Sequence, residues 1–249
     1  MTASTNWDAL CAKYLALLPR AKLPIPVILS KELTAPYVDI LRHLTNEDTD
    51  WLTRALVDPQ HKWFVVGFLE AAPSIADDLF APILNAAVDE VNPSLNRLFI
   101  EPCIRAFGSC RVIEYFLGVL ENGTDFQRPG AVNALYWCGG PLVFPGDIPS
   151  LDAEHPTAES RAEADRFADL WSRERTLLLR TFVSNANVDV RRSVIGHLGL
   201  CEADCDPTDR PLVPRAIAIA RAHPDQYIRH RVAVQLGESR IFKALPHRQ

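Results

Sequence analysis

Two stretches near the C-terminal end constrain the fold more than any other feature, because they carry one pattern 38 residues apart. The first, NVDVRRSVIGHLG, covers residues 187–199, and the second, DQYIRHRVAVQLG, covers residues 225–237. In both, apolar residues recur every three or four positions, which is typical of an amphipathic helix. In both, a basic residue (Arg191 or Arg229) stands within the apolar stripe. The chain therefore repeats one helical unit.

The same pattern occurs less regularly around Lys62, Arg97 and Arg128. The five basic positions are separated by 35, 31, 63 and 38 residues, and the gap of 63 holds one unit plus an irregular loop and a long helix. A repeat of about 20–50 residues made of paired helices is the signature of an α-solenoid. The predicted fold class is all-α, with little or no sheet.

The two stretches resemble the HEAT-repeat family, whose pattern is an Asp, then Val-Arg, then small and apolar residues ending in Leu-Gly. The two C-terminal units match well, two middle units match in part, and roughly the first 45 residues hardly match. The resemblance implies a right-handed α-α superhelix (solenoid) of HEAT-like helix pairs, with second helices lining a concave surface. It implies binding of other macromolecules and no particular chemistry.

Prolines mark helix starts. Asp58-Pro59, Asn92-Pro93 and Asp206-Pro207 each place a capping side chain before a proline and ahead of an apolar-periodic run. The predicted helices cover residues 7–18, 25–31, 35–45, 47–57, 59–72, 75–90, 93–107, 109–122, 125–138, 158–185, 188–201, 207–222 and 224–237. We expect one domain over residues 1–249, with capping helices in residues 1–45 and an irregular loop insertion at 139–157.

The two adjacent arginines of the first stretch point in different directions. With Val190 at 0°, Arg191 lies at about 100°, inside the stripe, and Arg192 lies at about 200°, facing away. A buried guanidinium has to be paired, and the candidate partners are Asp189, Asp225 or backbone carbonyls of a neighbouring helix. We therefore predict a structural ladder between repeats, formed by Lys62, Arg128, Arg191 and Arg229.

Positions facing away from the stripe are aromatic at the N-terminal end and polar or basic at the C-terminal end. The protein-binding candidates are Trp63, Phe64, Phe68, Trp137, Arg192, His230 and Arg231. Two interpretations of the aromatic set stay open. The N-terminal helices cover it as the cap that solenoid ends need, or it is an exposed patch for another protein. The basic set is either solvated charge or a site for an anionic partner.

Charge and cysteine usage narrow the class of protein. The chain of 249 residues has a net charge of −5, with −9 in residues 1–160 and +4 in residues 161–249. A chain of this balance is not an obvious nucleic-acid binder. Six scattered cysteines and the lack of a signal peptide or membrane span predict a reduced, cytoplasmic protein that has no membrane partner. Abundant Arg and Ala point to a bacterial source.

No catalytic motif occurs in the sequence. His197, Cys201 and Cys205 recur every four residues, but a zinc site needs a fourth ligand and usually a Cys-x-x-Cys knuckle, so we predict no metal and no cofactor. Gly-rich phosphate loops, nucleophile elbows and His-Glu-x-x-His are lacking. The sequence therefore predicts a non-catalytic protein-binding scaffold or adaptor that uses the concave face of its solenoid.

The alternative function is a HEAT-like nucleic-acid-binding protein or alkylated-base DNA glycosylase. In this interpretation Trp63, Trp137 and Trp171 stack on nucleic acid, and Asp125 or Asp189 supplies a carboxylate. Against it, a DNA groove needs several Lys or Arg residues to neutralise phosphates, and the units with the aromatic residues are net acidic.

Overall fold

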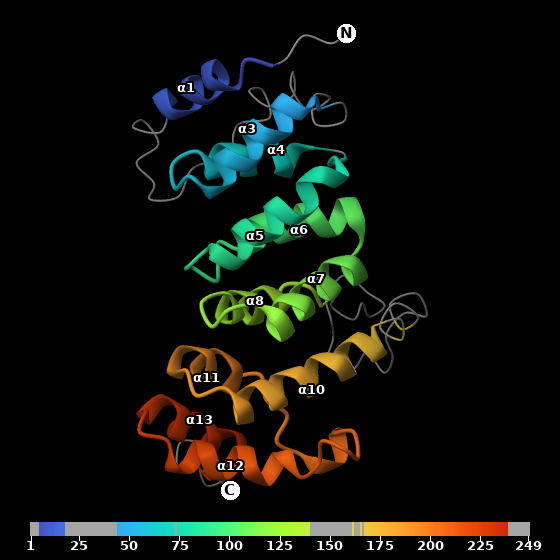
Figure 1. Ribbon diagram of the computed structural model, residues 1–249, viewed down its shortest axis with the longest axis vertical. Helices are drawn as coiled ribbons and strands as arrows, with labels where there is room; N and C mark the ends of the chain where they lie inside the picture. Colours follow the sequence, from blue (N-terminus) through green and yellow to red (C-terminus); the bar gives the residue numbers. More distant parts are fainter. Residues whose placement is uncertain are drawn as a thin grey trace, which may run out of the picture. The chain divides into compact units, whose positions relative to one another are not determined.

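The regular structure of this chain is helical (Figure 1). The computed structural model describes residues 5–17, 44–72, 74–139, 161, 165 and 167–238. These residues contain no β-strand, which confirms the predicted all-α class. The elements are α1 (Trp7–Leu17), α3 (Asn46–Val57), α4 (Lys62–Ala71), η3 (Asp77–Leu79), α5 (Phe80–Asp89), α6 (Arg97–Phe107), α7 (Ser109–Asn122), α8 (Gln127–Leu135), α10 (Ala168–Ser184), α11 (Val188–Ile195), η4 (Glu202–Asp204), α12 (Leu212–Ala222) and α13 (Gln226–Gln235).

Packing divides the chain into two compact units. Unit 1 comprises Met1–Val112 and Ala134–Cys138, and unit 2 comprises Ile113–Asn133 and Gly139–Gln249. Helix α7 begins in unit 1 and continues in unit 2, whereas α8 begins in unit 2 and ends in unit 1. The single domain expected over residues 1–249 stays a prediction.

Both units stack helix pairs in the same way. In unit 1, α3 pairs with α4 and α5 with α6, while α3 packs on α5 and α4 packs on α6. In unit 2, α10 pairs with α11 and α12 with α13, while α10 packs on α12 and α11 packs on α13. Within each unit, first helices thus stack on first helices and second helices on second helices, as in Figure 1.

Most of the prolines expected at helix starts lie in the turns just before them. The Asp58 carboxylate accepts the backbone N–H groups of Gln60 and His61, and α4 begins only at Lys62. Asn92 and Asp206 accept backbone N–H groups two residues on in the same way, at Ser94 and Thr208. These capping residues therefore form an Asx turn that delays the helix by several residues.

The second helices α11 and α13 begin at side-chain caps. Asn187 accepts the backbone N–H groups of Asp189 and Val190, and Asp225 accepts that of Ile228. Both caps satisfy backbone donors that have no partner within the helix. The two repeated stretches therefore have the same local structure at their start.

Some predicted segments lie wholly or partly outside the described residues. These are residues 25–31 and 35–45 of the expected capping region, the loop insertion at 139–157, and the start of the helix expected at 158–185. The rest of that last helix is observed as α10. Among the described helices, none has an apolar stretch long enough to cross a lipid bilayer.

Candidate interaction surface

Three arginines occupy one equivalent position in unit 2. Each lies near the start of a helix that follows a turn (α8, α11 or α13), and its backbone N–H donates to the carbonyl of a residue four positions earlier, just before that helix. The pairs are Arg128 with Thr124 (3.0 Å), Arg191 with Asn187 (3.1 Å) and Arg229 with Asp225 (3.3 Å). At this position a side chain leans towards the helix start, because Cα–Cβ bonds in a helix tilt towards its N-terminus.

Each of these side chains donates to carbonyls in the last turn of the preceding helix or directly after its end. Arg128 donates to Leu120 (3.1 Å) and Glu121 (3.3 Å), and Arg191 Nε donates to Phe182 (3.2 Å). Arg229 Nη1 donates to the carbonyls of His223 (2.5 Å) and Pro224 (2.7 Å). The end of a helix carries unpaired carbonyls and partial negative charge, so a guanidinium is favoured there. We call this contact the arginine clasp.

The clasp corrects the predicted ladder between repeats. Arg128, Arg191 and Arg229 each close their own helix pair, and Arg191 makes no ion pair with Asp189 or Asp225 among the described residues. A backbone carbonyl is a sufficient partner for the Arg191 guanidinium, because the Arg191 side chain is only half-buried. Burial lowers the pKa of the Arg191 guanidinium, which no carboxylate offsets.

Lys62 has a different role from the three arginines. Its backbone N–H donates to the Asp58 carbonyl, so it occupies the same position in the pair α3–α4. Its ammonium group, however, lies 2.5 Å from Glu90, the residue that ends α5 and is 8% exposed. The other Glu90 oxygen accepts the Asn92 backbone N–H. Lys62 therefore joins the α3–α4 turn to the next pair of unit 1.

Arg192, predicted to face outward, lies between two helix pairs of unit 2. Its side chain is 51% exposed, with Nε 3.7 Å from the Asp225 carboxylate and the guanidinium 5.7 Å from the Tyr227 ring centroid. Arg192 is therefore both accessible and held in place by the start of α13.

Arg231 is not the free outward side chain that the sequence predicts. It is half-buried and donates to the Gly196 carbonyl (3.5 Å), next to Gln235, which donates to the carbonyls of Ile195 (2.9 Å) and Leu198 (3.3 Å). These two residues of α13 thus hold the end of α11. His230 is exposed.

Phe64 and Phe68 are buried, each 2% exposed, so they cannot form the exposed aromatic patch. Helix α1 covers them through Trp7, whose ring centroid lies 6.4 Å from that of Phe64 and 5.7 Å from that of Phe68. The Trp7 indole N–H donates to the buried Asp48 carboxylate (2.7 Å). Of the two interpretations, the N-terminal cap therefore holds for these two residues.

The two other aromatic candidates are partly exposed and packed within unit 1. Trp63 lies 5.7 Å from Phe99 between ring centroids, and the Lys62 ammonium lies 4.9 Å from its ring. Trp137 donates its indole N–H to the Pro93 carbonyl (2.9 Å) and packs edge-on against exposed Tyr136.

Among the described residues, five of the six exposed large apolar side chains lie at the turns between paired helices, and the sixth, Tyr136, follows α8. In unit 1 the five include Val57, at the α3–α4 turn, and Val91, at the α5–α6 turn. In unit 2 they are Phe126 (77% exposed), Val188 (41%) and Tyr227 (43%), one at each of the turns α7–α8, α10–α11 and α12–α13. Sequence reasoning missed these five because a helical wheel describes positions within a helix, and these residues lie in turns or at helix ends.

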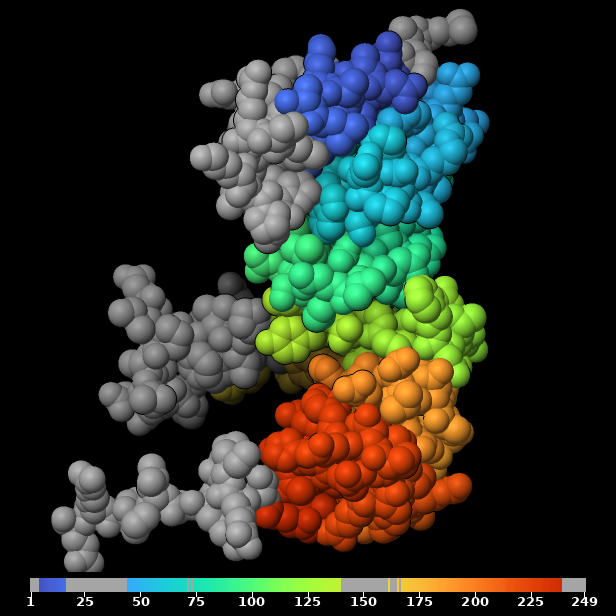
Figure 2. Space-filling model, turned by 90° about the vertical axis from the view of Figure 1, so that its left-hand side faces the viewer, coloured from blue at the N-terminus to red at the C-terminus, as the bar shows by residue number. Residues whose placement is uncertain are grey.

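Polar contacts join the three turns of unit 2 into one surface, which we call the turn edge. The Asn185 amide donates to the Asp125 carboxylate (2.6 Å), linking the turns α7–α8 and α10–α11. Arg192 links α11 to Asp225 and Tyr227 at the turn α12–α13. The turns lie on the left of unit 2 in Figure 1, and Figure 2 views this side.

The charges of the turn edge are mixed. Arg128, Arg192 and Arg229 stand beside acidic residues at the same turns, namely Glu121, Asp125, Asp189 and Asp225. Such a surface suits a protein better than a phosphate backbone, which needs an excess of basic residues. The carboxylate of Asp125 is bonded to Arg128 and Asn185.

The described residues hold no cluster of three or more His, Cys, Asp or Glu side chains that could bind a metal ion. His197, Cys201 and Cys205 do not converge, since the helix α11 ends at Ile195 and the predicted helical spacing is lost. No family model, curated protein or solved structure matches this chain.

Proposed function

We propose that this protein is a non-catalytic protein-binding scaffold, and that the turn edge of unit 2 is its binding surface. The observation that carries the proposal is the presence of Phe126, Val188 and Tyr227, one exposed apolar side chain at each of three linked turns. Tyr and Arg together are typical of the residues that dominate protein–protein binding. The stacked Arg192 and Tyr227 are such a pair.

The stacking of helix pairs in both units supports a HEAT-like solenoid. Such a fold presents second helices to a partner. Val188 and Arg192 on α11, and Tyr227 and His230 on α13, lie at or near the starts of two second helices. The binding surface proposed here therefore lies along the starts of the second helices.

The test replaces apolar surface without adding charge. The variant Phe126→Ser/Val188→Ser/Tyr227→Ser removes the three side chains of the turn edge, at first-turn positions where serine is tolerated. The matched control, Val57→Ser/Val91→Ser, makes the same kind of change at the turns of unit 1. The wild-type protein and both variants are tagged and expressed in the organism from which the protein comes. They are compared by affinity capture, with a photo-crosslinking residue in place of residue 226.

We expect the triple variant to lose the cross-linked partner while the control keeps it, with the same thermal midpoint for both. A partner that survives the triple variant, or that both variants lose, would refute the turn edge as the binding surface. A nucleic acid recovered in place of a protein would refute the scaffold itself.

A further inference from the structure

The N-terminal helix α1 lies at the end of unit 1, beside α3 and α4 (Figure 1). Its side chains Trp7, Cys11 and Tyr14 are buried, whereas Ala12 and Lys13 are exposed. The buried positions are i, i+4 and i+7, which is the spacing with which a peptide helix anchors on the surface of another protein. Helix α1 therefore contacts unit 1 in the manner of a bound peptide.

The surface beneath α1 is aromatic. It is formed by Trp51 of α3 and by Phe64 and Phe68 of α4, and we call it the aromatic face. Trp7 stacks on Trp51, and Tyr14 lies 5.7 Å from Phe64 between ring centroids. Aromatic side chains, Trp and Tyr above all, carry much of the binding energy of protein interfaces. The contact between α1 and unit 1 thus has the composition of an interface between two proteins.

Two indole–carboxylate hydrogen bonds cross this contact in opposite directions. Trp7 donates to Asp48 at 2.7 Å, and Trp51 donates to Asp8 at 2.9 Å. The backbone N–H of Thr5 also donates to Asp48, at 3.2 Å. All three bonds lie at the start of α1. A helix that makes the same contact needs a Trp followed directly by an acidic residue.

Tyr14 is the residue at which α1 fits the aromatic face poorly. Its hydroxyl is buried and has no hydrogen-bond partner among the described residues. Burial raises the pKa of Tyr14 to about 12, so the hydroxyl keeps its proton and is an unpaired donor. A buried donor without a partner costs free energy, and a phenylalanine ring in the same place avoids that cost. A helix with Phe at this position would therefore bind the aromatic face more tightly than α1 does.

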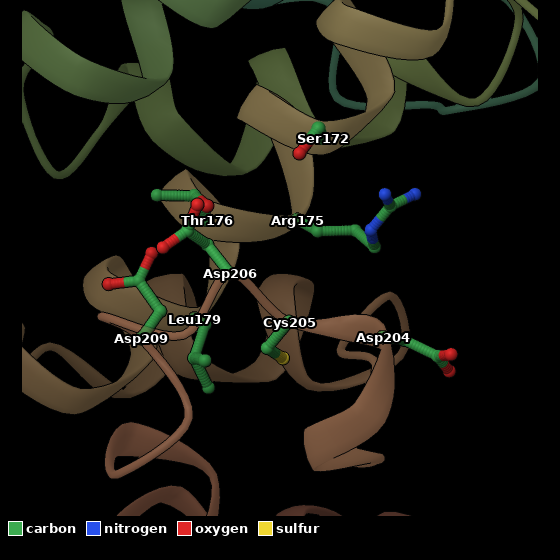
Figure 3. Close-up of a pocket in the computed structure, with 8 residues that line it drawn as sticks. All are labelled: Ser172, Arg175, Thr176, Leu179, Asp204, Cys205, Asp206 and Asp209. Atoms are coloured by element: carbon green, nitrogen blue, oxygen red, sulfur yellow. The ribbon is translucent and has the colours of Figure 1, made fainter.

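A buried polar atom without a partner is not a binding site by itself, as Asp209 of unit 2 shows. One of its carboxylate oxygens has no partner, but the other accepts a hydrogen bond from Arg180. The pocket beside it, between α10 and the segment that leads into α12, holds no more than about one water molecule (Figure 3). Tyr14 differs because it lies in a contact that a second helix can reproduce.

We infer that the aromatic face is a second protein-binding surface, and that α1 occupies it as a built-in competitor of a partner helix. The partner is an amphipathic helix of another protein. It carries Trp followed by an acidic residue, an apolar residue four positions after the Trp, and Phe seven positions after it. A second copy of the chain suits the surface less, because its α1 has the same Tyr14. The inference does not rest on the turn edge, which belongs to unit 2.

The experiment measures the binding of fluorescent peptides to the full-length protein by fluorescence anisotropy. The probe is residues 5–17 with Tyr14→Phe, acetylated and labelled at its C-terminal end. We expect saturable binding, about tenfold tighter than that of the peptide with Tyr14, because the unpaired hydroxyl is absent. A probe that also carries Trp7→Ala is the control, and it does not bind, since it lacks both the ring and the indole donor.

Two variants of the full-length protein test whether α1 competes with the probe. Trp7→Phe removes the donor to Asp48, so α1 leaves the aromatic face more often and the probe binds about tenfold tighter. Trp137→Phe makes the same change at an indole that donates to Pro93, and leaves probe binding unchanged. Probe binding also speeds the modification of the protein's Cys11 by a thiol reagent, measured by peptide mapping, because displaced α1 exposes this buried thiol.

The inference is overturned if the probe binds neither the wild-type protein nor Trp7→Phe. Equal binding to these two proteins, or binding that does not speed the modification of Cys11, also overturns it, since α1 then does not compete for the site. A dimer of the full-length protein that the probe dissociates, detected by light scattering, overturns it in favour of a second copy of the chain.

Discussion

The arginine clasps bind carbonyls at or directly after the ends of α7, α10 and α12. In each, one guanidinium holds the start of a second helix beside the carbonyls that end or follow the first helix. The neighbouring Arg192 makes a longer contact, 3.7 Å to Asp225, from a side chain that is 51% exposed. The contacts of the adjacent Arg191 and Arg192 therefore differ in how exposed they are to water.

We predict that Arg191→Met lowers the free energy of unfolding by about 1–3 kcal/mol, because the Phe182 carbonyl loses a charged hydrogen bond. The matched change Arg192→Met costs about 0–1 kcal/mol, since its ion pair is exposed. Urea unfolding followed by circular dichroism measures both. Equal losses in the two variants would contradict the clasp.

A second prediction concerns His223, which is 7% exposed and whose Nδ1 atom accepts the Asp225 backbone N–H at 3.1 Å. Burial lowers the pKa of His223, and Arg191 and Arg229 lower it further against the opposing charge of Asp225. The unfolded chain therefore binds this proton more readily than the folded protein does. Stability falls as the pH drops below about 6.5, the ordinary histidine pKa, and levels off below the lower folded value.

His223→Asn keeps an acceptor for the Asp225 N–H and removes the titration. We expect this variant to lose less stability than the wild type between about pH 7 and pH 5. His230→Asn, at an exposed histidine of α13, is the control and keeps the wild-type pH dependence. Urea unfolding at a series of pH values measures the difference, and identical slopes for wild type and His223→Asn would rule out the effect.

At the scale of elements, α1 packs within unit 1 through an aromatic cluster that contains two indole hydrogen bonds, from Trp7 to Asp48 and from Trp51 to Asp8 of α1. Trp7 stacks on Trp51, with ring centroids 5.8 Å apart, and its indole N–H reaches Asp48, which is 2% exposed. Burial raises the pKa of Asp48, but hydrogen bonds from Thr45 and Trp7 outweigh it and hold the pKa below its ordinary value. The carboxylate is therefore ionised and paired beneath the helix.

We predict that Trp7→Phe releases α1 more often, because it keeps an aromatic ring and removes the donor to Asp48, at a cost of about 1.5–3 kcal/mol. Cys11 on α1 is 3% exposed, so its modification by a thiol reagent reports the release. Cys103 in α6 is fully buried and is the internal control. An unchanged rate at Cys11 would mean that the indole hydrogen bond does not hold α1.

Sequence reasoning located the helices better than it located their exposed faces. The helix predicted at 109–122 matches α7, and the paired stretches near the C-terminus begin at the expected caps. The helical wheel places Phe64 and Phe68 outside the core stripe because it assumes one solvent face, so the sequence left open whether a cap covers them. The segment KWFVVGFLEA is apolar almost all round, a signal that α4 is enclosed on every side.

The identity of a polar partner is harder to predict from sequence than its existence. The position of Arg191 in the apolar stripe predicts that its guanidinium has a partner. The sequence does not decide whether that partner is Asp189, Asp225 or a backbone carbonyl. Only the fold decides among them, because helix crossing brings the end of α10 to Arg191. The buried Asp209 likewise pairs with a residue far along the chain, Arg180, which no local pattern connects to it.

At the scale of the whole molecule, the distribution of charge indicates which class of macromolecule the protein can bind. The net charge is −5, and many arginines of the described helices already bind carbonyls or carboxylates, for example Arg105, Arg111 and Arg173. A duplex DNA needs several uncommitted basic residues to replace its counterions.

We therefore predict no binding of a labelled DNA duplex at about 100 mM salt, measured by fluorescence anisotropy. A second titration at about 50 mM salt, where contacts to phosphate are stronger, shows whether the assay can detect weak DNA binding. Tight binding with a steep salt dependence would support the nucleic-acid alternative instead.

The arginine clasps span short distances along the chain, 8 residues for Arg128 to Leu120, 9 for Arg191 to Phe182 and 6 for Arg229 to His223. Each helix pair of unit 2 therefore contains everything that closes its own turn. Adding or deleting one whole pair would leave every other clasp intact, whereas contacts between pairs, such as those of Arg231 and Gln235 to the end of α11 and that of Arg192 to Asp225, would need a new match. The length of such a chain can change in steps of one pair without reopening a turn.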